Sequence, residues 1–349
     1  MRVLNTLPQA DLRTTAAAAI KAEADGYDAV LTMENKHDPF LAHAIAAVNT
    51  DRIELGTSVA IAFPRSPMVV ANTSWDLQNA SSGRFVLGIG PQIKPHNERR
   101  FSVPWTAPAP RLREYVQALR AIWTTWETGE TLDFRGQHYT FTLMPPYFMP
   151  PSMHQKMVPI TLAAVGEHSL RLAGEVADGV RLHGFCTRRY MEEMIMPRLL
   201  EGMARTGRTR DHFEITGGGF VATGKDADAV AQAFEIVRGR VGFYGSTPAY
   251  WGVLELHGYG DLGRELNALT KAGKWNEMAA RIPDEVVHLF AAVGTHKEIA
   301  GKIAERFGGL SDAINLRPDS SGFGGDVPPE VIAEIKALPT PFQGYRTAW

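Results

Sequence analysis

The stretch from Ile53 to Gly90 constrains the fold more than any other part of the sequence. It opens and closes with apolar runs rich in β-branched residues, at 53–61 and 84–90, which are typical of buried strands. Between them, Pro67 stands where the first turn of a helix tolerates proline, and apolar residues then recur at helical spacing. Strand, helix and strand in so short a segment form a βαβ unit, so we expect the two strands to be parallel neighbours.

Strands and helices alternate in the same way along the rest of the chain. We expect eight strands, at 3–7, 29–33, 53–61, 84–90, 158–164, 179–183, 213–222 and 313–316. The expected helices lie at 11–25, 39–48, 67–80, 111–127, 169–176 and 226–238, with a further one from 295. Eight strands alternating with helices favour an α/β fold of the (β/α)8 TIM barrel type. The competing arrangement is an open doubly wound sheet, which usually has fewer strands.

Two long segments interrupt this alternation. Residues 128–157, between strands 4 and 5, contain a possible hairpin at 132–139 and the proline-rich sequence MPPYFMPPSM. Residues 242–290, between strands 7 and 8, form the other insertion. Loops this long in a compact domain are often lids or interface elements. We therefore predict one barrel domain over 1–349 that carries both insertions.

Composition excludes several classes of protein. The net charge is −2, from 36 basic and 38 acidic residues, and no basic run indicates a nucleic-acid partner. No apolar stretch approaches the roughly 18 residues that span a bilayer, and the N-terminal sequence lacks the apolar core of a signal peptide. Cys186 is the only cysteine, which excludes an internal disulfide and fits a reducing compartment. We expect a cytoplasmic protein without a membrane partner.

Several motifs of well-known enzyme classes are absent from the sequence. Gly88 and Gly90 begin a pattern like that of dinucleotide-binding turns, but Ile93 occupies the third glycine position, which argues against an NAD site. The P-loop, HExxH and GxSxG patterns do not occur, and the histidines lack metal-ligand spacing. We therefore expect no metal site.

The order of several motifs resembles that of the luciferase-like flavin and deazaflavin oxidoreductases, and most closely their F420-dependent branch. The motifs are LGTSV at 55–59, RSP at 65–67, GRFVLGIG at 83–90, ENKHDPF at 34–40, RLREYVQALRAIW at 111–123 and LAGEVADG at 172–179. The ordered set is more specific than any one of its members. The resemblance implies an oxidoreductase that transfers a hydride between coenzyme F420 and a small organic substrate, and it implies a homodimer.

The resemblance also implies where the ring of the cofactor binds. In this family the place of Ser58 and Val59 often holds a non-proline cis peptide, whose bulge supports the middle ring of the flavin or deazaflavin. The alternative is an ordinary trans strand residue at this position, since cis bonds before residues other than proline are rare. A barrel of this type has its active site at the C-terminal ends of the strands, and Ser58 and Val59 lie near such an end.

The phosphate tail of the cofactor is expected at two turns. Ala164, Val165 and Gly166 join the fifth strand to the start of a helix, where free N–H groups and the helix dipole attract anions. The resemblance places the tail there and at the turn after the sixth strand, which contains Gly184 and Phe185. A plain strand-to-helix turn is the alternative at both places.

A hydride transfer of this kind also requires a proton to move, so we expect one positioned acid or base. Glu34 aligns with an acidic residue near the cofactor in the F420 enzymes that this chain resembles, and His37 follows it closely. The family's adjacent Asp–His pair is not matched, because Glu34 and Asn35 stand in its place and His37 and Asp38 are displaced. Asp38 can equally cap the helix that follows. His96, after the fourth strand, is the second acid/base candidate, with a surface histidine as the alternative.

Other functions remain open on the sequence alone. FMN could replace F420, which would make the protein a luciferase-like monooxygenase, and no residue separates the two cofactors. A barrel that binds a deazaflavin without catalysis is a second alternative, and a barrel hydrolase or lyase is a third. Aromatic residues of the two insertions and nearby loops could line a substrate cavity or pack between subunits: Trp105, Tyr147, Phe148, Tyr244, Tyr250 and Trp251.

Overall fold

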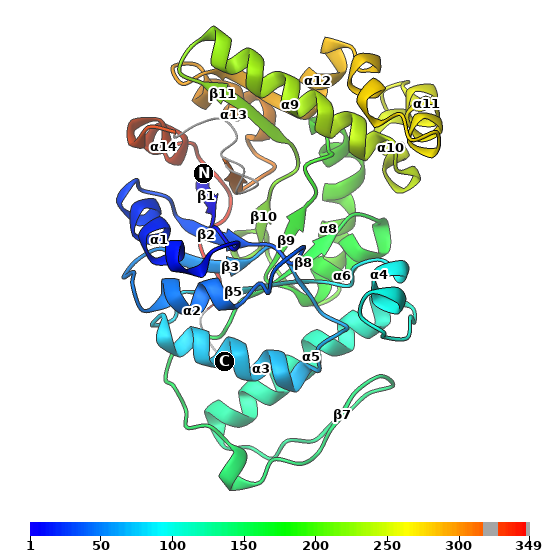
Figure 1. Cartoon of the computed structure of the whole chain (residues 1–349). Helices are drawn as coiled ribbons and strands as arrows, with labels where there is room; N and C mark the ends of the chain where they lie inside the picture. The colour runs from blue at the N-terminus through cyan, green and yellow to red at the C-terminus, as the bar shows by residue number, and fades with distance from the viewer. Residues whose placement is uncertain (317–326, 347–349) are drawn as a thin grey trace. The chain divides into compact units, whose positions relative to one another are not determined.

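The computed structural model describes residues 1–316 and 327–346 (Figure 1). Nine of its strands form one sheet in the order β3-β2-β1-β13-β10-β9-β8-β5-β4, and an additional pairing of β3 with β5 closes it. The strands are β1 (Arg2–Thr6), β2 (Ala29–Thr32), β3 (Glu54–Thr57), β4 (Ala60–Ile61), β5 (Phe85–Gly90), β8 (Ile160–Ala164), β9 (Gly179–Leu182), β10 (Glu214–Thr216) and β13 (Ala313–Asn315). Because β3 and β4 share one position, the sheet is a closed parallel barrel of eight positions, and the predicted (β/α)8 fold is confirmed.

Helices alternate with the strands along the described chain. They are α1 (Thr15–Ala24), α2 (Leu41–Ala47), α3 (Pro67–Ala80), α4 (Lys94–Arg99), α5 (Pro108–Thr128), α6 (Glu167–Val176), α7 (Arg188–Tyr190), α8 (Met196–Ala204), α9 (Ala227–Gly245), α10 (Trp251–Glu255), α11 (Gly260–Lys271), α12 (Asp284–Phe290), α13 (Ile299–Phe307) and α14 (Pro329–Lys336). In α5 the predicted apolar face of Leu112, Val116, Leu119 and Trp123 is buried.

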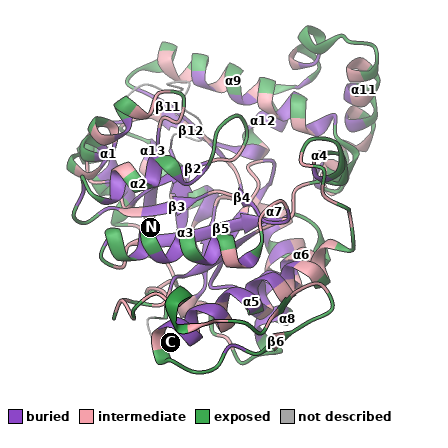
Figure 2. Ribbon diagram, turned by 60° about the horizontal axis from the view of Figure 1, so that its bottom comes forward, coloured by how far each residue is buried: buried purple, intermediate pink, exposed green. Residues whose placement is uncertain are grey.

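The strands are buried along their whole length where the sequence shows continuous apolar runs. All residues of β2 and of β5 are buried, as expected for parallel strands whose two faces are both covered. Figure 2 shows buried residues along the strands and exposed residues on the outer faces of the helices. Local sequence signals set several boundaries: Ser66 accepts a hydrogen bond from the N–H of Met68 at the start of α3, and Ser82 and Gly83 have positive φ at its end.

The predicted seventh strand is shorter than expected. The sequence predicts one strand over 213–222, but β10 ends at Thr216, and Gly217 and Gly218 follow with φ of +88° and +94°. This left-handed backbone cannot continue a strand. The chain then forms β11 (Phe220–Gly224), which pairs in parallel with β12 (Ala291–Thr295) in a separate two-stranded sheet.

Both insertions have structure of their own. The hairpin predicted in 128–157 is present as β6 (Phe134–Arg135) and β7 (Thr140–Phe141), which pair antiparallel. The segment 242–290 is helical: it contains the end of α9 and the helices α10, α11 and α12. Its buried face contributes to an apolar cluster that includes Phe185, Val241, Leu254, Leu266 and Phe290.

The described chain divides into two compact units. One contains Met1–Leu4, Leu182–Pro197 and Ile215–Pro341, and the other contains Asn5–Arg181, Arg198–Glu214 and the segment from Phe342. The single-domain assignment made from the sequence stays a prediction. No helix in the described part of the chain is long and apolar enough to cross a membrane.

Candidate functional site

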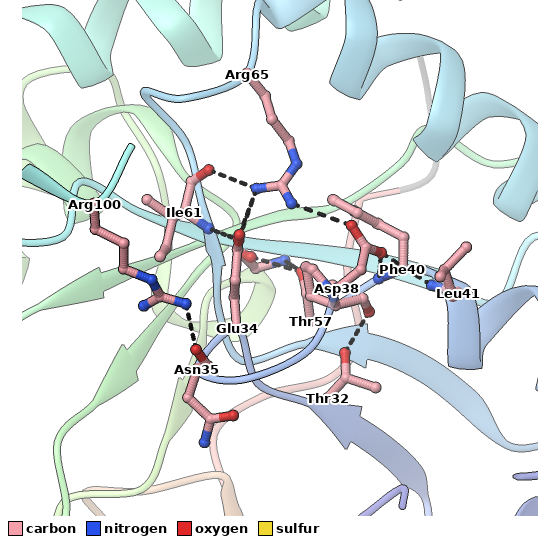
Figure 3. Close-up of polar contacts among 12 residues, drawn as sticks. Thr32, Glu34, Asn35, Asp38, Phe40, Leu41, Thr57, Ile61, Arg65 and Arg100 are labelled. Atoms are coloured by element: carbon pink, nitrogen blue, oxygen red, sulfur yellow. Dashed lines mark hydrogen bonds and ion pairs between the residues drawn. The ribbon is translucent and has the colours of Figure 1, made fainter. Parts of the chain in front are cut away.

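A charged network lies at the C-terminal end of β2 (Figure 3). The carboxylate of Glu34 accepts hydrogen bonds from the backbone N–H of Ile61 at 2.6 Å and from the Nη1 of Arg65 at 2.7 Å. The Glu34 side chain is only 6% exposed and that of Arg65 is 20% exposed. A carboxylate this deeply buried needs a partner of opposite charge, and Arg65 supplies it.

The second arm of Arg65 reaches Asp38. Its Nη2 lies 3.2 Å from Oδ2 of Asp38, whose other oxygen accepts from the N–H groups of Phe40 at 2.8 Å and Leu41 at 3.2 Å. Asp38 therefore caps the start of α2, which was the alternative reading of this residue. The guanidinium also lies over the ring of Phe40, 5.5 Å from its centroid. Arg65 thus connects the loop after β2 to the turn before α3.

The bond between Ser58 and Val59 is cis, as the family resemblance implied. It separates β3 from β4 and lies beside the charged network, because the N–H of Glu34 donates to the carbonyl of Val59 at 3.4 Å. The N–H of Ser58 donates to the backbone carbonyl of Thr32 in β2 at 2.7 Å. Both Ser58 and Val59 are half-buried. The structure therefore brings Glu34 together with Ser58 and Val59.

Glycines in the neighbouring strand β5 make room for this part of β3. A Cβ on Gly88 would lie 1.9 Å from the carbonyl oxygen of Thr57, and one on Gly90 would lie 3.1 Å from the side chain of Val59. The hydroxyl of Thr57 also donates to the carbonyl of Gly88 at 2.6 Å and accepts from its N–H at 2.9 Å. Close packing thus requires Gly88 and favours Gly90 in the GRFVLGIG motif.

The turn at 164–166 begins a helix, as predicted. Ala164 ends β8 and is buried, Val165 is 40% exposed, and Gly166 precedes the first residue of α6. Gly166 offers no side-chain cap, so the first N–H groups of α6 lack a side-chain partner from this position. The exposed Glu167 in the first turn places one negative charge there. Binding of a phosphate tail at this turn stays a prediction.

In the turn after β9, some backbone donors already have partners. The N–H of Phe185 donates to Nδ1 of His183 at 3.0 Å, and that of Cys186 donates to the carbonyl of Gly184 at 2.9 Å. The side chain of Phe185 is 2% exposed and belongs to the apolar cluster. The cofactor-binding roles of Gly184 and Phe185 stay predictions, with fewer free N–H groups than the sequence suggested.

The two histidines expected to act as acid or base lie in a loop and in a short helix. His37 is exposed in the loop after β2, and His96 is half-buried in α4. Among the described residues, neither ring has a hydrogen-bond partner. Near them, Arg100 donates to the carbonyl of Asn35, which ties the segment after α4 to the loop that contains His37. The structure thus shows no direct contact of either ring with Glu34.

Sequence reasoning missed two residues of these strand ends. In the sequence Arg65 stands out only as the first residue of the RSP motif, although two acidic residues at one strand end call for a nearby cation. The other is His183, whose ring packs against those of Tyr244 and Tyr250, and burial lowers its pKa to about 4. No pattern in the sequence pairs these aromatic residues. In the described chain, no group of three or more side chains could hold a metal ion.

Comparisons with known proteins identify the family of this chain. A model of the luciferase-like monooxygenase family matches residues 2–312. The chain belongs to this family. An uncharacterized protein of Mycobacterium tuberculosis is 48% identical over 303 residues, which are 87% of this chain and 89% of the relative. A 5,10-methylenetetrahydromethanopterin reductase of Archaeoglobus fulgidus is 30% identical over 294 residues, 81% of this chain and 83% of the relative.

A solved structure supports the fold. The coenzyme F420-dependent tetrahydromethanopterin reductase of Methanopyrus kandleri matches with a TM-score of 0.76 at 19% identity, over 97% of both chains. The resemblance inferred from the motifs is therefore confirmed, and the relatives and neighbours include enzymes named as F420-dependent. An oxidoreductase or monooxygenase of this superfamily is the activity that the comparisons support.

Proposed function

We propose that this protein transfers a hydride between F420 and a small organic substrate. The observation that carries the proposal is the 30% identity, over 81% of the chain, to a methylenetetrahydromethanopterin reductase. The arrangement at the end of β3 supports it, because the half-buried Ser58 and Val59 lie beside a charged network. Fold similarity alone would not distinguish this function from others in the superfamily.

The residues present fit a flat ring that carries a phosphate-bearing tail. Val59 offers a half-buried aliphatic side chain at the C-terminal end of a barrel strand. The uncapped N-terminus of α6 offers N–H groups to an anion near the partly exposed Val165. When bound, F420 supplies the carbon that accepts or releases the hydride. The protein contributes position and electrostatics.

The proton that accompanies the hydride is assigned to an imidazole. Glu34 is held by Arg65 and by the N–H of Ile61, so its carboxylate keeps the loop after β2 in place. His37 and His96 have ring nitrogens without a partner in the described chain, which leaves them free to take or give a proton. We assign Glu34 to positioning and propose that one of the two histidines transfers the proton.

A titration of the purified apoprotein with oxidised F420 and, separately, with FMN tests the cofactor. Quenching of tryptophan fluorescence reports binding of either. We expect F420 to bind with a Kd of about 1 μM or lower and FMN to bind at least about tenfold more weakly. Preference for FMN would favour a luciferase-like monooxygenase, and binding of neither would contradict both assignments.

Two matched variants test whether the phosphate tail of F420 binds at residues 164–166. Val165→Glu places a carboxylate at the start of α6 and should weaken F420 binding about tenfold by repelling the phosphate. Leu200→Glu introduces the same charge at an exposed position of α8 and should leave the Kd unchanged. Equal effects of the two substitutions would remove the assignment of the tail to residues 164–166.

A further inference from the structure

The residue directly after β9 is a histidine whose tautomer is fixed by the backbone. Nδ1 of His183 accepts the N–H of Phe185 at 3.0 Å. A ring nitrogen that accepts a hydrogen bond carries no hydrogen, so the neutral ring has its hydrogen on Nε2. His183 therefore has one donor, and the direction of that donor is set by the orientation of the ring.

Two tyrosines fix this orientation. The ring of Tyr250 is stacked on that of His183 with centroids 4.7 Å apart, and the ring of Tyr244 meets it edge-on at 4.3 Å. Tyr244 lies in α9 and Tyr250 in the short helix at 248–250, so both come from the second insertion. Phe185 lies 5.7 Å from Tyr250 and connects the three rings to the apolar cluster. Packing of this kind holds a side chain in one rotamer.

These surroundings keep His183 and Tyr250 uncharged. Burial lowers the pKa of His183 to about 4, with no opposing contribution from a charged neighbour. Burial and the neighbouring Tyr244 both raise the pKa of Tyr250, which stays a phenol at neutral pH. A neutral imidazole in such a place donates a hydrogen bond without becoming a cation.

The polar atoms of the three residues are available to an external molecule. His183, Tyr244 and Tyr250 are half-buried. Within residues 1–316 and 327–346, Nε2 of His183 and the two hydroxyls have no protein partner, yet none of the three is fully occluded. A donor that is desolvated, oriented and unused in the free protein is the kind of group that binds a ligand oxygen.

We propose that His183, with Tyr244 and Tyr250, binds the oxygen of a substrate carbonyl group, with Nε2–H of His183 as the donor. This inference rests on the proposed function and specifies the substrate as an uncharged carbonyl compound. His183 follows a barrel strand at its C-terminal end, where barrel enzymes bind their substrates. No charged neighbour contributes to the pKa of His183, so this donor suits the oxygen of an uncharged carbonyl group.

The chemistry of reduction explains why such a donor is useful. The carbonyl carbon would accept the hydride that reduced F420 supplies, the π electrons would move to the oxygen, and a proton that comes ultimately from the solvent would add to that oxygen. The carbonyl compound would become an alcohol, and reduced F420, having lost a hydride and a proton, would become oxidised F420. Negative charge develops on the oxygen during the transfer, and a preoriented donor in a desolvated site stabilises it. Substitution of His183 should therefore affect the chemical step more than it affects the binding of F420.

NMR of protein labelled with 15N-histidine tests the site without F420. The signals of His183 are identified as those that disappear from the spectrum of the His183→Gln variant. We expect the Nε2–H tautomer from pH 5 to 8, and a saturable shift of the Nε2–H signal when cyclohex-2-enone is added as a probe. A hydrogen on Nδ1 or no response to the enone would each overturn the proposal, whatever the cofactor proves to be.

Kinetics with reduced F420 and the same enone give an independent test. His183→Leu should lower kcat about 100-fold and leave the Kd of F420 within about twofold, whereas His183→Gln, which keeps a donor, should recover part of the rate. The matched control is His154→Leu, whose side chain is 88% exposed in the first insertion. If His183→Leu is unfolded by circular dichroism, Tyr250→Phe provides the test, with KM expected to rise about threefold. Unchanged kinetics in the folded variants would exclude a role for His183.

Discussion

The ends of β2 and β9 hold their polar side chains in opposite ways. After β2, the carboxylates of Glu34 and Asp38 are fixed by ion pairs with one arginine, Arg65. After β9, the imidazole of His183 packs against the rings of two tyrosines, and burial lowers its pKa to about 4 without a contribution from a charged neighbour. One strand end is organised by charge and the other by packing.

This difference determines how each region depends on its parts. In the charged network each partner offsets the free-energy cost of burying the other's charge. Removal of one partner therefore leaves a buried charge without compensation. In the aromatic group each ring contributes area and shape, so removal of one weakens the packing without stranding a charge. The charged network is therefore suited to hold a loop rigidly, and the aromatic group is suited to present a neutral donor.

Removal of Arg65 should have the largest effect. Arg65→Met leaves Glu34, which is 6% exposed, without its cation, and should lower the free energy of unfolding by about 3–5 kcal/mol. Urea denaturation followed by circular dichroism measures the change. Adding Glu34→Gln to this variant removes the stranded charge and should recover about half of the loss.

Asp38→Asn is the control for this network, because its side chain is 39% exposed and should cost only about 1 kcal/mol. A loss of less than about 1 kcal/mol in Arg65→Met would show that Glu34 does not depend on the ion pair.

Acid should have the second largest effect, because the folded protein holds two histidines in the neutral form. Burial lowers the pKa of fully buried His43 in α2, and that of His183, from 6.5 to about 4. Between these values the unfolded chain binds more protons than the folded one, so the stability present above pH 6.5 is lost as the pH falls toward 4. For His43 the loss is roughly 3 kcal/mol.

Chemical denaturation at pH 7 and pH 4.5 measures this effect. His43→Gln keeps a donor for the carbonyl of Gly56, which Nε2 of His43 contacts at 3.0 Å, but it cannot be protonated. This variant should lose less stability than the wild-type protein over the same interval. An identical loss would assign the acid sensitivity to other groups.

Adding a methyl group at a glycine should reduce stability by different amounts at the two strand ends, and this difference should be smaller than the effect of removing Arg65. In Gly88→Ala the new Cβ would lie 1.9 Å from the backbone oxygen of Thr57, which cannot move without breaking β3. In Gly184→Ala it would lie 2.5 Å from the ring edge of Phe220, which can turn aside. We expect losses of about 3 and about 1 kcal/mol, from thermal denaturation. The reverse order would show that the β9 turn is the more rigid of the two.

Loss of one stacked ring should have the smallest effect. Tyr250→Leu keeps an apolar side chain but removes the stacking on His183 at 4.7 Å, which should cost about 1 kcal/mol. Thermal unfolding measures it, and Tyr147→Leu, at a tyrosine that is 94% exposed, is the control with no expected change. A loss as large as that of Arg65→Met would remove the distinction between the two regions.

Much of the barrel could be predicted because its signals are local. The βαβ unit at 53–90, the start of α3 at Ser66 and Pro67, and the hairpin in 128–157 each depend on residues close together in the chain. The seventh strand was predicted too long because the apolar residues on the two sides of Gly217 and Gly218 were joined into one strand. Consecutive glycines are themselves a signal of an interrupted strand, and the positive φ of these two ends β10.

The sequence by itself determined the alternation of strands and helices, the family, and the cis bond that the family resemblance implied at Ser58–Val59. Only the tertiary structure decided that Arg65 pairs with Glu34 and Asp38, and that Tyr244 and Tyr250 enclose His183. The physical reason is the range of the interactions. Propensity, capping and periodicity act within a few residues, whereas partners for a buried charge or ring come from segments that only packing brings together.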